Sequence, residues 1–109
     1  MICITVYKNR EQEYTAFRCK GHAGYAVSGE DIVCAAVSVL VINAINSVEQ
    51  LVSDRFDLTT DSDTGRIDFS LKEGYSESSL LLLRSLVLGL QGIQKNYGKK
   101  YVSLTFEEV

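Results

Sequence analysis

The sequence predicts an α+β fold in which a mixed or antiparallel sheet carries two packed helices, in the order ββαββαβ. Two observations predict this fold. Residues 31–52 and 77–97 repeat apolar side chains at helical spacing, and five shorter segments alternate apolar and polar residues as strands do. Those five segments are residues 2–8, 13–20, 55–60, 66–71 and 100–106. A sheet with one apolar face needs helices to cover it, so the two helices are expected to form a second layer.

The first two strands are predicted to form a hairpin. Residues 2–8 and 13–20 are separated by a polar turn at 9–12. Because residues opposite each other in a sheet point to the same face, this alternation turns Cys3 outward and Cys19 toward the core. The two sulfurs then cannot bond to each other, and we interpret both cysteines as packing residues.

The first helix is expected over residues 31–52, where apolar residues recur at helical spacing and several alanines favour helix. Either Ser28 or Asp31 can cap its start. The preceding segment, residues 21–30, contains three glycines and reads as a loop.

The second hairpin joins residues 55–60 and 66–71 through a turn at 61–65. Its second strand is expected to present one apolar face. The closing strand is expected to point three apolar side chains inward: Val102, Leu104 and Phe106.

The second helix is predicted to begin after Ser76 as its cap and to end at Gly98. Its leucine run, residues 80–83, is apolar over more than one face. Gly89 and Gly92 would also let another element approach closely. Two interpretations remain open: this surface packs within the core, or it forms a homodimer contact.

Size and composition bound the possible functions. A chain of 109 residues suits a single domain, here residues 1–109. The formal net charge of -3 argues against non-specific nucleic-acid binding, which needs a basic surface. The start of the chain lacks the pattern of a secretory signal, and the apolar run at 32–45 is too short to span a membrane. We therefore expect a cytoplasmic protein with reduced thiols.

The residue types also argue against cofactor chemistry. One histidine and no Cys-x-x-Cys pair give too few ligands for zinc. No phosphate-binding glycine motif of the Walker or dinucleotide type is present. We expect neither a metal nor a cofactor.

Cys34 is the residue best placed for chemistry. If Asp31 caps the helix, Cys34 occupies the third helical position, where unpaired N–H groups favour a thiolate and can hold an oxyanion. The alternative is that Cys34 is a small buried hydrophobe on an apolar helix face.

His22 is the only histidine, and it follows a strand within the glycine-bearing loop. From there it could take the Cys34 proton and later protonate a leaving amine. It could equally be a surface histidine. Asp31 could orient His22 instead of capping the helix. Ser38 lies one turn after Cys34 on the same helical face. It could support the site, or its hydroxyl could simply bond to the Cys34 carbonyl.

A resemblance to a known family rests on two segments, Gly21-His22-Ala23 and Gly29-Glu30-Asp31-Ile32-Val33-Cys34-Ala35-Ala36-Val37-Ser38. They resemble the signature of the Prp family of bacterial ribosomal-processing cysteine proteases. The resemblance extends over the whole chain, including its length, its element order and its leucine-rich second helix.

The resemblance implies a cysteine endopeptidase that removes the N-terminal extension of a large-subunit ribosomal protein, L twenty-seven, after aromatic residues. It implies His22 and Cys34 as the catalytic pair and a homodimeric assembly. It also implies a mobile substrate loop at 23–30, and the loop residues carried over are Ala23, Gly24, Tyr25 and Gly29. Relatives often carry an aromatic residue near position 28, where this chain has Ser28.

Two other functions compete with this reading. In the first, the chain is a non-catalytic ribosome-associated module whose loop grips a peptide, and Cys34 is inert. In the second, Cys34 serves a thiol redox or acyl-transfer reaction, which needs a resolving thiol or an acyl donor. The sequence positions neither Cys3 nor Cys19 as that resolving thiol.

Overall fold

The predicted element order is confirmed. A computed structural model describes the backbone of residues 1–21 and 30–109, and the side chains of residues 1–21 and 32–109. The strands are β1 (Ile2–Lys8), β2 (Tyr14–Lys20), β3 (Phe56–Asp61), β4 (Arg66–Leu71) and β5 (Val102–Glu108), and the helices are α1 (Glu30–Leu51) and α2 (Glu77–Tyr97). Every element lies within about two residues of its predicted ends, which is the usual spread of such boundaries.

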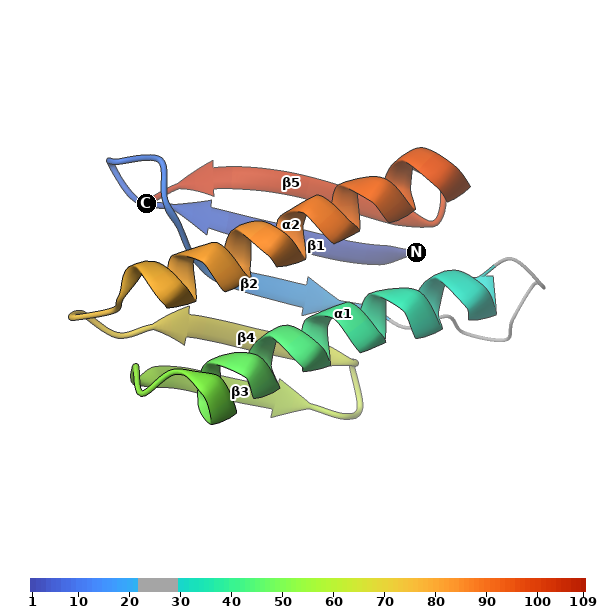
Figure 1. Ribbon diagram of the computed structural model, residues 1–109. Helices are drawn as coiled ribbons and strands as arrows, with labels where there is room; N and C mark the ends of the chain where they lie inside the picture. The colour runs from blue at the N-terminus through green and yellow to red at the C-terminus, as the bar shows by residue number, and fades with distance from the viewer. Residues whose placement is uncertain (22–29) are drawn as a thin grey trace.

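The five strands form one sheet in the order β3-β4-β2-β1-β5. β2 pairs with β1 and β4, and β3 pairs with β4, all in the antiparallel sense, whereas β1 and β5 are parallel. The sheet is therefore mixed. Both helices lie side by side on one face of it (Figure 1). α2 carries the chain back along the sheet, which is what a parallel β5 requires.

The core lies between the helix layer and the sheet. Phe69 on β4 stacks on Phe17 of β2 and Phe56 of β3, with ring centroids 5.1 and 5.0 Å apart. The valines of α1 that face the sheet are buried, and so are the inward leucines of α2. Burial of this apolar surface is the main favourable contribution to the free energy that holds the two layers together.

The predicted strand faces are confirmed for the first hairpin. Cys3 pairs with Lys20 and is exposed, whereas Cys19 pairs with Ile4 and is buried. All three cysteines are free thiols. The prediction for the last strand is only partly right. Val102 is buried, but Phe106 is 37% exposed, because helix cover ends toward the C-terminus of this edge strand.

The two ends of α2 are held by different groups. Ser76 occupies the predicted cap position, but its hydroxyl makes no cap bond. Instead, Asp54 Oδ2 accepts hydrogen bonds from the Ser76 N–H (2.7 Å), the Ser76 hydroxyl (2.8 Å) and the buried Ser79 hydroxyl (2.6 Å). At the other end Gly98 closes the helix as predicted, donating its N–H to the Gln94 carbonyl at 2.8 Å.

Two expectations about α1 are wrong. The helix begins at Glu30, so Asp31 lies inside it and does not occupy the cap position, while Ser28 lies outside the described residues. Residues Ile32–Leu51 are also long and apolar enough to cross a membrane by length and composition alone. The core helix of a globular protein passes the same test, and α1 buries Val33, Val37 and Val48 between the layers.

Gly89 shows why the two helices pack closely. A Cβ on Gly89 would lie 2.8 Å from Leu40 Cδ1 of α1, so this glycine admits the neighbouring helix of the same chain. Within the described part of the chain, a Cβ on Gly92 would meet no heavy atom within 4 Å. Core packing therefore accounts for Gly89. It does not account for Gly92.

Candidate active site

Cys34 is held in place by the buried face of α1. Val33 is fully buried and Val37 is 2% exposed, so the first turns of the helix are fixed on the sheet. Cys34 itself is half-buried and packs against the core cluster. The thiol is thus carried on a rigid element at the end of the sheet where β2 ends and β1 begins (Figure 1).

The observed helix start changes the position of Cys34. Counting from Glu30, Cys34 is the fifth residue of α1 and not the third. The four unpaired N–H groups of a helix belong to its first four residues, here Glu30 to Val33. Any oxyanion contact from the helix terminus therefore comes from the turn before Cys34.

A cavity of about 310 Å³ opens beside Cys34. On the helix side, Cys34, Val37, Ser38 and Val41 line it. These positions follow one another at i, i+3, i+4 and i+7, which is one stripe of the helix. Ser38 is exposed, so it lies at the rim of the cavity. The two sequence-predicted residues that the structure describes with side chains, Cys34 and Ser38, thus share one site.

The sheet contributes the opposite wall. Cys19 pairs with Ile67, and Ile67 pairs with Thr60, so these three residues form one row across β2, β4 and β3. All three line the same cavity as Cys34. Two strand spacings separate the ends of the row, which is about 10 Å. The cavity therefore runs from the Cys34 thiol toward the free edge of the sheet.

Gly21 marks where the chain leaves β2 next to this cavity. Its φ is +99°, and an added Cβ would lie 2.5 Å from the Met1 carbonyl oxygen. Both facts require glycine at this position, because a side chain would be strained and would clash with the backbone. Gly21 also lines the cavity and directly precedes His22 in sequence.

Cys19 differs chemically from Cys34, although both face the cavity. Burial raises the pKa of the Cys19 thiol to about 11, with smaller contributions from the neighbouring thiols Cys34 and Cys3. A thiol with so high a pKa holds little thiolate near neutral pH and is a poor nucleophile. Cys19 is therefore ill-suited to act as a resolving thiol for Cys34.

Several predicted site residues fall outside this description. His22 and the loop residues Ala23, Gly24, Tyr25 and Gly29 lie outside the described residues, and the side chain of Asp31 is not described. The sequence by itself does not indicate that the second hairpin belongs to the site. Strand alternation puts Thr60 and Ile67 on the helix-facing side, but their nearness to Cys34 depends on the strand order.

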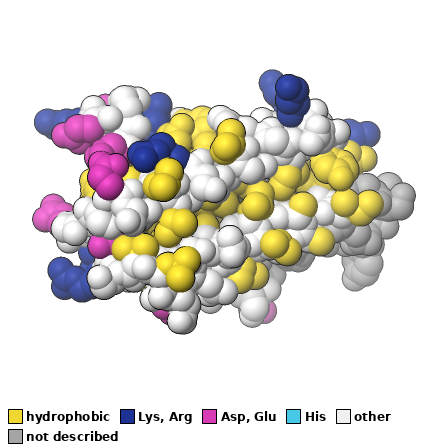
Figure 2. Space-filling model, viewed as in Figure 1, with side chains coloured by type: hydrophobic (Ala, Val, Ile, Leu, Met, Phe, Trp, Pro, Cys, Tyr) yellow, Lys and Arg dark blue, Asp and Glu magenta, His cyan; other side chains and the backbone are white. Residues whose placement is uncertain are grey.

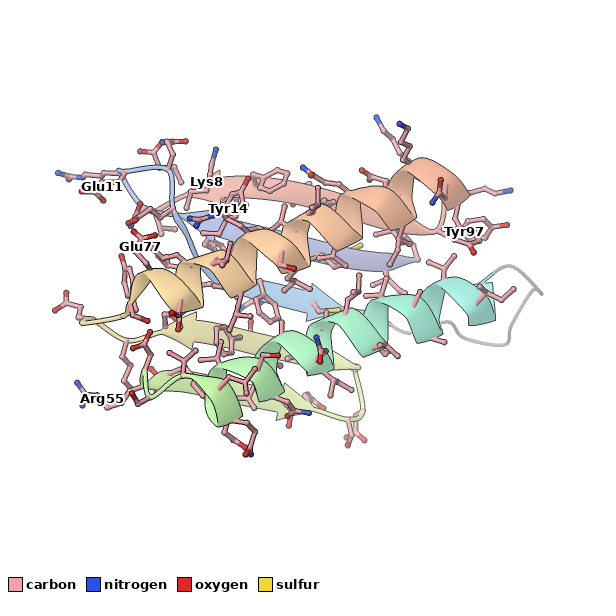
Figure 3. The ribbon with its side chains drawn as sticks, in the orientation of Figure 1. Lys8, Glu11, Tyr14, Arg55, Glu77 and Tyr97 are labelled. Atoms are coloured by element: carbon pink, nitrogen blue, oxygen red, sulfur yellow. The ribbon has the colours of Figure 1, made fainter. Side chains whose placement is uncertain are left out.

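Charged side chains are unevenly distributed between the two ends of the molecule. Lys8, Glu11 and Glu77 lie at the opposite end from the start of α1 (Figure 3). Figure 2 shows most of the visible acidic groups at that far end, basic groups at both ends, and hydrophobic side chains along the helix layer. Two charged residues, Asp61 and Arg66 of the second hairpin, nevertheless line the cavity next to Cys34.

Comparison with known proteins identifies the family. The sequence model of the family described as cysteine protease Prp matches residues 1–103. The ribosomal processing cysteine protease Prp of Staphylococcus aureus (strain Mu50) is 28% identical over 99 residues, covering 91% of this chain and 93% of that protein. The Bacillus subtilis (strain 168) protein of the same name is 29% identical over 101 residues, covering 89% and 90%.

A solved structure shares the fold. The crystal structure of the essential ribosomal processing protease Prp from Staphylococcus aureus, in complex with a covalently linked product peptide, superposes with a TM-score of 0.88. It is 27% identical and covers 98% of this chain and 100% of its own. The half-buried thiol on α1, the adjacent cavity and these matches agree, and this chain belongs to the cysteine protease Prp family.

Proposed function

We propose that this cysteine protease removes the N-terminal extension of a large-subunit ribosomal protein, L twenty-seven, with Cys34 as nucleophile and His22 as general base. The observation that carries the proposal is the position of Cys34, half-buried on α1 with its side of the helix open to a cavity. The relatives named above are ribosomal processing proteases, and one of them holds a covalently linked product peptide.

The reaction follows from a thiol and an imidazole. His22 takes the Cys34 proton, and the thiolate attacks the carbonyl carbon of the scissile bond. The tetrahedral intermediate collapses as His22 returns the proton to the leaving amine, which leaves a thioester on Cys34. Water activated by His22 then hydrolyses the thioester and restores the thiol. One water molecule is consumed for each peptide bond cleaved, and both Cys34 and His22 return to their starting states.

The remaining site residues have supporting roles in this proposal. Ser38 lies at the cavity rim one turn after Cys34, where it can contact the bound peptide. Asp31 lies in the first turn of α1, where it can orient the general base. Ala23, Gly24, Tyr25 and Gly29 are carried over from the family as the segment that contacts the substrate. A peptide chain crossing the cavity would meet Cys34 and Ser38.

We further propose that the protein acts in the cytoplasm as a homodimer, joined through its helix layer. Between residues 32 and 48 the sequence of α1 contains no charged residue. On the solvent side of the two helices, Val39 is 66% exposed, Leu81 is 59% exposed and Leu88 is 71% exposed. Apolar surface of this kind favours contact with a second copy of the chain. The open Gly92 on α2 fits the same role.

Cleavage of a synthetic peptide tests the proposed function. The peptide carries the N-terminal extension of the ribosomal protein with its aromatic residues, and mass spectrometry locates the bond that is cut. We expect the wild type to cut one bond, Cys34→Ala to cut none, and His22→Ala to be slower by about 10²–10⁴-fold. Cys3→Ala is the matched control, because Cys3 is an exposed thiol on the outer face of the sheet.

The outcomes separate the alternatives. Loss of cleavage in Cys34→Ala with full activity in Cys3→Ala supports Cys34 as the nucleophile, and slowed cleavage by His22→Ala supports His22 as its partner. Equal cleavage by wild type and Cys34→Ala would show that Cys34 is not the nucleophile. Circular dichroism of each variant confirms that the fold is retained.

A further inference from the structure

The free edge of β5 is a surface that the proposed function does not use. β5 ends the strand order of the sheet and pairs with β1 on one side (Figure 1). Its register with β1 runs without a bulge from Val102 to Glu108. Proteins usually protect an edge strand with a bulge, a proline or a lysine, because unpaired backbone groups recruit other strands. The sequence of β5 contains neither proline nor lysine, so this edge is competent to pair.

Two hydrogen bonds show which residues of β5 turn their backbone toward that edge. The Ile2 N–H donates to the Tyr101 carbonyl at 3.0 Å, and the Val109 N–H donates to the Lys8 carbonyl at 2.9 Å. Residues 101 and 109 thus point their backbone groups at β1. Because these groups alternate in direction along a strand, the odd-numbered residues of β5 face β1 and the even-numbered ones face the free edge.

Leu104 and Phe106 form the open part of this edge. At Val102 the edge is already occupied, because the Gln94 side chain of α2 donates to the Val102 carbonyl at 3.0 Å. Among the described residues, no hydrogen bond reaches the backbone of Leu104 or Phe106 from that side. Leu104 is half-buried and Phe106 is 37% exposed, so apolar surface accompanies the open backbone groups.

We infer that β5 pairs antiparallel with β5 of a second copy of the chain, about a twofold axis at Thr105. In this register Leu104 lies opposite Phe106 of the second copy, and the two Thr105 side chains face each other. The two sheets become one continuous sheet, and helix-layer dimers are joined edge to edge. The inference does not depend on the catalytic residues, so it and the protease function can fail separately.

The side chains of β5 select this register. A twofold axis at Leu104 would place Phe106 opposite Val102, whose carbonyl already accepts a hydrogen bond from α2. A twofold axis at Phe106 would place Leu104 opposite the carboxylate of Glu108. An axis at Thr105 instead gives two aliphatic–aromatic pairs and one pair of threonines, and cross-strand pairs of both kinds stabilise sheets.

The charges at the ends of β5 favour an antiparallel copy as the partner. Lys99 and Lys100 come just before the strand, and Glu107 and Glu108 end it. An antiparallel copy brings the glutamates of each strand toward the lysines of the other, whereas a parallel copy would align like charges. Few residues take part, so we expect a weak contact that fills only at high concentration. At micromolar concentration the helix-layer dimer should remain the main species.

Sedimentation velocity at about 10 μM and about 300 μM tests the inference. We expect the weight-average mass of the wild type to rise about twofold between these concentrations, as a weak twofold contact predicts. Thr105→Glu and Thr105→Lys should each keep the mass seen at low concentration, because each variant places like charges opposite each other at the axis. An equal mixture of the two variants should regain the rise, because opposite charges then face each other.

Thr59→Lys is the matched control. It makes the lysine change on β3, the other edge strand, where the new side chain faces Asp68, and its mass should rise as the wild type does. Circular dichroism confirms that each variant keeps its fold. A wild type with the same mass at both concentrations, or a Thr105→Glu variant that rises like the wild type, would overturn the inference. A mixture that stays at the lower mass would show that the twofold axis does not lie at Thr105.

Discussion

Cys19 on β2 and Cys34 on α1 face one cavity from opposite walls, although fifteen positions separate them in the chain. Their environments differ. Cys19 is 7% exposed and its pKa is raised to about 11, mainly by burial, whereas Cys34 is half-buried on the helix. The two thiols that line this cavity therefore differ in their exposure to solvent, and we expect them to differ in reactivity.

Selective alkylation should reveal this inequality. At pH 7.5, iodoacetamide should modify Cys34 and the exposed Cys3, while Cys19 reacts at least about tenfold more slowly, because a thiol with a high pKa presents little thiolate. Peptide mapping by mass spectrometry over a time course measures each rate. Raising the pH toward 11 should increase the alkylation rate of Cys19 by a larger factor than the rates of Cys34 and Cys3. Equal rates for Cys19 and Cys3 at pH 7.5 would contradict the buried placement of Cys19.

Protonation of Asp54 at acid pH should lower the stability of the folded protein. Its hydrogen bonds from the Ser76 N–H, the Ser79 hydroxyl and the Ser76 hydroxyl lower the pKa of its carboxyl. A folded pKa below the unfolded value of about 3.9 means that the stabilisation is complete above that pH and is lost as the pH falls through the folded pKa. Asp54→Asn should thus lower Tm by several degrees at pH 7, and by progressively less as the pH falls below about 3.9.

Thermal unfolding across pH 2.5 to 7 measures this difference. Asp57→Asn is a suitable control, since Asp57 on β3 is exposed and pairs only with the surface Lys72 at 3.5 Å. A Tm difference between wild type and Asp54→Asn that stays constant across the whole range would show that the Asp54 charge plays no part.

Adding a side chain at Gly89 should disturb the packing of α1 against α2, whereas adding one at Gly92 should not. Gly89→Val should lower the free energy of unfolding by about 1–3 kcal/mol, because its side chain must displace Leu40. Gly92→Ala should raise it by about 0.5–1 kcal/mol, because alanine favours helix and its Cβ meets no described atom. Urea denaturation measures both values, and a stabilising Gly89→Val would contradict the observed packing.

The proposed dimer should depend on the helix layer. Leu88→Glu adds a charge to the exposed apolar surface of α2, and we expect it to convert the dimer to a monomer at micromolar concentration. Thr105→Glu, an exposed change on the edge strand β5, should leave the dimer intact. Sedimentation velocity of both variants beside the wild type measures the oligomeric state. A wild type that sediments as a monomer would refute the proposed assembly.

Much of this protein follows from local sequence. Alternation in residues 2–8 and 14–20 is enough to put Cys3 and Cys19 on opposite faces, because the side-chain period of a strand is two. Helical spacing likewise places both helices almost to the residue. The signature around Cys34 indicates the family, since a thiol at the start of a helix beside a glycine-bearing loop serves a specific chemistry.

Tertiary structure decided what local periodicity leaves open. The start of α1 at Glu30 moved Cys34 to the fifth helical position, and the hydroxyl of Ser76 bonds to Asp54 and not to its own helix. Above all, the order β3-β4-β2 brings Thr60 into the same cavity as Cys34. Strand pairing between distant segments depends on how the whole core packs. The proposed nucleophile can therefore be identified in the sequence, while the cavity beside it appears only in the fold.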